Sequence, residues 1–102
     1  MKRRPVKFTD TAKADLLELE IWLEDATGKR TARRYVDRLI DFCEGLDLAS
    51  ERGTQRYDLM PGLRIVGFER RVTIAFAVHD GRVDILRVFR AGRDWETELH
   101  ED

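Results

Sequence analysis

The sequence predicts an α+β fold: an N-terminal strand, an antiparallel helical hairpin, and a C-terminal three-stranded antiparallel meander on which the hairpin packs. Two observations predict it. Apolar residues recur at helical spacing through the first half of the chain, and residues 63–89 change to alternating runs rich in β-branched residues. The length of 102 residues fits one domain, 1–102, which ends in an acidic tail at 94–102.

The first expected elements are a short strand and a helix. Residues 5–10 (PVKFTD) form the strand, with Pro5 suited to a sheet edge and Thr9 or Asp10 to the helix N-cap. Over 11–26 one apolar stripe recurs at intervals of 4, 3, 4 and 3: Ala12, Leu16, Leu19, Leu23 and Ala26. Trp22 widens this stripe, and Leu17 and Ile21 make a second, smaller strip. The helix is therefore expected to contact a partner as well as its own core, with its acids, Asp15 and Glu18 included, facing solvent.

A second helix is expected over 30–48, after a glycine C-cap and turn at 27–29 (TGK). Its apolar stripe again has helical spacing: Ala32, Tyr35, Val36, Leu39, Phe42, Cys43 and Leu46. Because the turn is so short, the two helices must pack antiparallel. Residues 49–56 are interpreted as a polar connector.

Three strands are expected at 63–68, 70–79 and 82–89, the last two joined by a type I′ turn at Asp80–Gly81. Val72, Ile74, Phe76 and Val78 should share one face of the middle strand. The other face carries small side chains, among them Ala75 and Ala77, and is expected to be a shallow open surface. Strict alternation fails in the last strand. A bulge there would re-aim Arg87, whose direction the pattern leaves open.

Charge limits the possible partners. The chain has 19 basic and 20 acidic residues and a net charge of −1, which argues against binding energy that comes mainly from phosphate neutralisation. Residues 63–93 contain seven arginines and three acidic residues, whereas residues 94–102 contain five acidic residues and no lysine or arginine. The single cysteine, Cys43, rules out an intrachain disulfide. With no apolar leader and no membrane-length run, the expected compartment is the cytoplasm.

The candidate functional residues gather after the third run. Arg87, Arg90 and Arg93 either pair with the tail acids or Asp84, or form a recognition surface. Trp95 is either folded over the sheet or an exposed anchor. His79 and His100 are far apart and lack metal-ligand spacing, so no metal or other cofactor is expected. Cys43 is expected to be a buried apolar residue.

Residues 8–46 and 61–94 together resemble the ParE/RelE superfamily of toxins from type II toxin–antitoxin modules. The matching motifs are A-x-x-D-L at 12–16, Ala32–Tyr35–Val36, PGLR at 61–64 and V-x-I-L-R-V at 83–88. The resemblance implies two activities. ParE-like members poison DNA gyrase, whereas RelE-like members cut messenger RNA on the ribosome with cations and a C-terminal Tyr or His. No tyrosine follows Tyr57 and no lysine lies in 63–93. ParE-type behaviour therefore fits better.

We therefore expect a ParE-like toxin that inhibits gyrase by protein–protein binding, more as a poison than as an enzyme. The expected target surface is Arg64, Arg87, Arg90, Arg93 and Trp95. A ParD-like antitoxin would bind Leu17, Ile21 and Trp22 together with the open sheet face at Ala75 and Ala77, and DNA would be bound only indirectly, through the antitoxin. One alternative is a ribosome-dependent mRNA endonuclease, in which Arg64 and Arg87 hold the phosphate and His79 or His100 is the acid. Another is a diverged member that only binds its partner.

Overall fold

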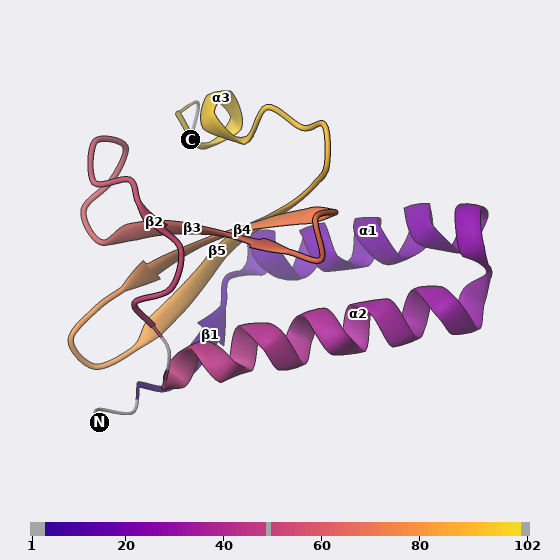
Figure 1. Ribbon diagram of the computed structural model, residues 1–102, viewed down its shortest axis with the longest axis horizontal. Coiled ribbons are helices and arrows are strands. Elements are labelled where there is room, and N and C mark those ends of the chain that lie inside the picture. Colours follow the sequence, from indigo (N-terminus) through magenta and orange to yellow (C-terminus); the bar gives the residue numbers. More distant parts are fainter. Residues whose placement is uncertain (1–3, 49, 101–102) are drawn as a thin grey trace.

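The computed structural model describes residues 4–48 and 50–100. It has three layers, of which the middle one is a single mixed sheet (Figure 1). The strands are β1 (Val6–Phe8), β2 (Thr54–Gln55), β3 (Leu63–Phe68), β4 (Val72–Val78) and β5 (Val83–Arg90). The helices are α1 (Asp10–Thr27), α2 (Lys29–Glu44), a 3-10 turn at Gly45–Asp47, and α3 (Trp95–His100). In Figure 1, α1 and α2 lie on one side of the sheet and α3 on the other.

The helical hairpin is confirmed, with its turn reduced to a single residue. Gly28 ends α1 and begins α2 with φ 88°, a left-handed conformation that favours glycine. Thr9 is the α1 N-cap, and its hydroxyl accepts from the Ala12 N–H at 3.0 Å. The far end of the hairpin projects past the sheet in Figure 1.

The sheet is larger than predicted, with strand order β1-β5-β4-β3-β2. The expected meander is its β3-β4-β5 part. β1 joins it parallel to β5, with Val6 opposite Val83 and Phe8 opposite Ile85. The prediction of a plain connector at 49–56 is wrong, because β2 pairs antiparallel with β3 there. Gly53 permits this approach: a Cβ on it would lie 2.2 Å from the Ile65 carbonyl oxygen.

The two hairpin turns differ from their predictions. β4 begins at Val72 instead of residue 70, because Glu69 and Arg70 form the β3–β4 turn with φ of 50° and 58°. The hairpin around Asp80–Gly81 is confirmed, but neither residue has a positive φ, so the turn is not type I′.

The main core lies between the hairpin and the sheet. Leu19 and Leu23 of α1 and Leu39 of α2 pack with Ile74 and Phe76 of β4. The predicted inward face of β4 is thus confirmed. None of the helices in residues 4–48 and 50–100 is long and apolar enough to cross a membrane.

Leu39→Ala is expected to lower the free energy of unfolding by about 2–5 kcal/mol, because it empties a fully buried site. Leu17→Ala, the same change on the exposed side of the hairpin, is expected to alter it by about 0.5 kcal/mol or less. Urea denaturation of both variants measures the difference. Equal losses would contradict this assignment of the core.

Candidate functional site

The start of α1 is fastened to the β5 edge where β1 ends. The Thr9 N–H donates to the Ile85 carbonyl at 3.0 Å, and the Thr9 hydroxyl donates to the Leu86 carbonyl at 3.0 Å. These two bonds continue the attachment to β5 beyond Phe8. They bring the next helical turn, with Asp15, over the last part of β5.

The predicted bulge is present and settles the direction of Arg87. Ala75 pairs with Arg87 while Phe76 pairs with Ile85, so Leu86 is the extra residue in β5. Ile85 and Val88 face the hairpin, and Leu86 and Phe89 pack in a cluster on the other face. Arg87 therefore shares the face of Ala75 instead of following Ile85 into the helical layer.

Asp15 joins the bulge to α1 through three hydrogen bonds. Its carboxylate accepts from Arg87 Nε at 2.8 Å, from Arg87 Nη2 at 3.2 Å and from the Val88 N–H at 2.9 Å. Both side chains are nearly buried, with 11% of Asp15 and 13% of Arg87 exposed. The expectation that Asp15 faces solvent is wrong, because the β5 edge beyond β1 needs an acceptor there. Sequence analysis missed this role, although Asp15 is part of the A-x-x-D-L motif.

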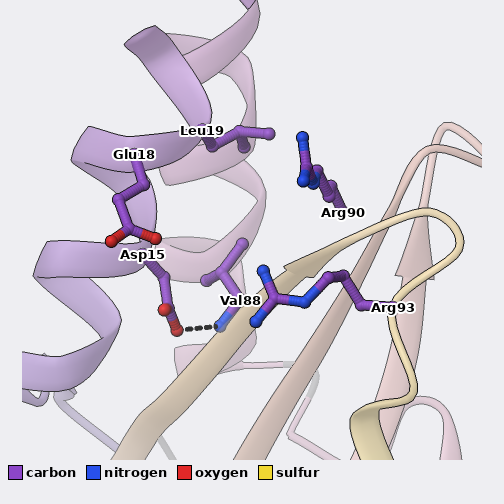
Figure 2. Close-up of a pocket in the computed structure, with 6 residues that line it drawn as sticks. All are labelled: Asp15, Glu18, Leu19, Val88, Arg90 and Arg93. Atoms are coloured by element: carbon purple, nitrogen blue, oxygen red, sulfur yellow. Dashed lines mark hydrogen bonds between the residues drawn. The ribbon is translucent and has the colours of Figure 1, made fainter. Parts of the chain in front are cut away.

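Two further arginines lie beside this ion pair at a small polar pocket, shown in Figure 2. Its lining comes from α1, β5 and the segment after it: Asp15, Glu18, Leu19, Val88, Arg90 and Arg93. Arg93 forms a bidentate ion pair with Glu98 of α3, which raises the pKa of Arg93 and lowers that of Glu98. The Arg90 guanidinium stacks on the Trp22 ring, 4.9 Å from its centroid. Three predicted residues, Arg87, Arg90 and Arg93, thus gather at one end of β5.

Arg64 and Trp95 do not join this group as exposed contacts. Arg64 is buried, and its Nη1 donates to the backbone carbonyls of Glu51 and Arg52 at 3.0 and 3.2 Å. The expectation that Arg64 is exposed is therefore wrong, because its side chain holds the loop before β2. Trp95 packs over the sheet, with the Arg56 guanidinium 5.4 Å from its ring centroid. Of the two interpretations of Trp95, the folded-back one is confirmed.

The expected open sheet face is also wrong. Ala75 and Ala77 are buried, because a second apolar cluster covers this side of the sheet. Leu59, Trp95 and Leu99 pack there against Leu63, Ala75 and Phe89. Ion pairs hold α3 in place, from Arg56 to Glu96 at 3.1 Å and from Arg93 to Glu98. The small side chains on β4 make room for α3.

The exposed strip on α1 is confirmed. Leu17 and Ile21, the predicted second strip, are 62% and 56% exposed. Trp22, which the pattern placed at the edge of the core stripe, is itself 49% exposed and extends this strip. Three such neighbours on one helix form an apolar surface of the kind that partners bury.

His79 and Cys43 lie away from the polar pocket of Figure 2. His79 lies beside Asp84, 3.3 Å from Nε2 to Oδ2, near the β4–β5 turn at the opposite end of β5 from Arg87. Cys43 is buried, as expected, and burial raises its pKa to about 12. The His100 side chain lies outside the described residues. Within residues 4–48 and 50–99, no cluster of His, Cys, Asp and Glu has the arrangement of a metal site.

Known proteins are similar to this chain in sequence and in fold. A family model described as "ParE toxin of type II toxin-antitoxin system, parDE" matches residues 6–95. A structure of the chromosomal ParDE toxin–antitoxin system from P. aeruginosa is similar with a TM-score of 0.74 and 26% identity, covering 86% of this chain and 96% of that one. The RelBE2 toxin–antitoxin complex from Mycobacterium tuberculosis has a TM-score of 0.64 and 21% identity, covering 91% and 97%, and shares the fold. No curated protein matches the sequence.

Asp15→Asn is expected to lower the free energy of unfolding by about 2–3 kcal/mol, because the nearly buried Arg87 loses its nearest counter-charge and keeps only the more distant Glu98, at 3.7 Å. Glu18→Gln is the matched control, since Glu18 is exposed and lines the same pocket. It should change the value by about 0.5 kcal/mol or less. Urea denaturation measures both. An Asp15→Asn variant as stable as wild type would mean that Asp15 does not hold the bulge.

The attachment of α3 is expected to weaken in acid. Because Arg93 lowers the Glu98 pKa below its ordinary value of 4.5, the stabilisation is complete above pH 4.5 and is lost as the pH falls through the lowered pKa. Trp95 fluorescence in a Trp22→Phe background should report this step. Glu98→Gln should remove it, and an unchanged acid transition in that variant would refute the assignment.

Proposed function

The chain belongs to the ParE toxin family of type II toxin–antitoxin systems, and we propose that it inhibits DNA gyrase in the cytoplasm by binding it as a protein partner. The observation that supports this proposal is the internal pairing of Arg64 and Arg87, the two arginines that would have to hold the phosphate in RNA cleavage. Arg87 is bound by Asp15, Arg93 by Glu98, and Arg64 by backbone carbonyls. Cleavage of RNA needs cations free to stabilise a pentavalent phosphate and groups placed to move protons.

The proposed target surface is centred on Arg90 and Arg93 at the end of β5. Both line the polar pocket of Figure 2, where side chains from α1 and β5 meet. Trp95 supports this surface from beneath, since it anchors α3 and so positions Glu98 for Arg93. Arginine suits such a surface, because its planar head forms bidentate bonds with carboxylates and stacks on rings.

The proposed antitoxin surface is the exposed strip of α1, Leu17, Ile21 and Trp22. A ParD-like antitoxin would lay an amphipathic helix along it, burying apolar area that is open to water in the free toxin. An antitoxin is likewise part of the P. aeruginosa ParDE system, to which this chain is similar. DNA would be reached through the antitoxin.

Purified toxin is expected to inhibit supercoiling by gyrase. Arg90→Ala combined with Arg93→Ala should raise the toxin concentration needed for half inhibition by about tenfold or more, in keeping with the loss of an interfacial arginine contact. Arg34→Ala on α2, an exposed arginine away from the pocket, is the control and should behave as wild type.

Expression of the same toxin in cells distinguishes gyrase inhibition from the alternative activity, cleavage of messenger RNA. Gyrase poisoning breaks chromosomes, whereas messenger cleavage stops translation. Full gyrase activity at high toxin excess, together with messengers cut at defined codons after induction, would overturn the gyrase proposal in favour of ribosome-dependent cleavage.

A further inference from the structure

A second pocket, distinct from that of Figure 2, lies between the helical hairpin and the end of the sheet. We call it the Tyr35 groove. Its lining is apolar apart from one hydroxyl and one guanidinium: Leu19, Trp22, Leu23, Tyr35, Arg71, Val72 and Ala91. Trp22 belongs both to this groove and to the exposed α1 strip. The strip and the groove therefore form one continuous surface.

The Tyr35 hydroxyl in this groove has no hydrogen-bond partner among residues 4–48 and 50–99. The residue is 6% exposed, and its ring packs edge-on against Phe68 with the centroids 5.6 Å apart. Loss of solvation raises the pKa of the hydroxyl. A buried hydroxyl without a partner is costly, and nearly all such groups in proteins are satisfied. The free toxin leaves this donor unused.

Two guanidinium groups flank the groove, and neither forms an ion pair with a carboxylate of the described residues. Arg71 is exposed and lines the groove. Arg90 stacks on Trp22 at the other rim. By contrast, Arg38, on the same helix as Tyr35 and 5.2 Å from the centroid of its ring, is bound to Glu69 at 3.0 Å. The groove thus combines an apolar floor with positive charge on two sides.

We propose that the Tyr35 groove receives a long apolar side chain from the antitoxin helix that binds the α1 strip, and that carboxylates beside this side chain pair with Arg71 and Arg90. The proposal rests on the proposed function, because the occupant is the antitoxin. Side chains three or four residues apart on a helix lie on one face, so one helix can contact Ile21 and also fill the groove past Trp22. The exposed Arg71 side chain would turn toward a carboxylate of the antitoxin helix. An oxygen atom of the antitoxin could then accept a hydrogen bond from the Tyr35 hydroxyl.

The test measures the affinity of the full-length toxin for the cognate antitoxin co-expressed with it. Tyr35→Phe keeps the ring and removes only the hydroxyl. This variant should be as stable as wild type or more so when free, yet bind the antitoxin about fivefold more weakly. A purely structural role for Tyr35 would not give opposite changes in stability and affinity.

The charge test uses neighbouring arginines. Arg71→Glu is expected to weaken antitoxin binding by about tenfold or more and to reduce its dependence on salt. Arg70→Glu makes the same change in net charge one residue away, outside the groove, and should have a much smaller effect.

Two results would overturn the proposal for the Tyr35 groove, and a third would overturn the proposed function. If Tyr35→Phe and Arg71→Glu bind the antitoxin like wild type while Ile21→Asp does not, the groove is unoccupied and only the strip is the antitoxin surface. If the groove variants lose gyrase inhibition but keep antitoxin affinity, the occupant is the target. If the wild-type toxin binds no antitoxin, the proposed function itself fails.

Discussion

The carboxylate of Asp15 is the contact on which the arrangement of this molecule depends. It lies on the first helix, yet it accepts from the backbone of Val88 and from two nitrogens of the Arg87 guanidinium, 72 residues later in the chain. A nearly buried charge needs an opposite charge and filled hydrogen-bond positions, and Asp15 supplies both to Arg87. It therefore fixes α1 over the bulge, and with it the position of every side chain at the end of β5.

This constraint explains how the single strand β5 contributes side chains to two apolar layers. With the extra residue at Leu86, β5 sends Val88 into the main core and Phe89 into the cluster under α3. The arginines lie at the boundary of these layers, where carboxylates from α1 and α3 reach them. The surface that remains for partners has two parts. It is apolar on α1, and it is cationic at Arg71 and Arg90, which form no ion pair within the described part of the chain.

Local pattern predicted much of the fold; the predictions of the two turns are wrong in local detail, and the larger errors come from contacts that no local pattern reveals. Periodicity identified both helices, the inward face of β4, the α1 strip and the break in alternation at Arg87, because each is visible within a few residues. The parallel partner of β1 and the cover over Ala75 depend on segments far apart in sequence, and the two-residue strand β2 is too short to show an alternating pattern. Arg64 illustrates the limit, since an arginine in a strand has the same local signature whether it faces a target or binds the loop before it.

The parallel pairing of β1 with β5 has a consequence for synthesis. β1 is the first strand to leave the ribosome. Because β5 is its only neighbouring strand among the described residues, β1 cannot join the sheet until β5 has been made. Until then Asp15 of α1 is likewise without its hydrogen-bond donors Arg87 and Val88. Contacts of such long sequence separation form late in folding. A growing chain of this protein therefore stays without its finished binding surfaces until translation has passed β5.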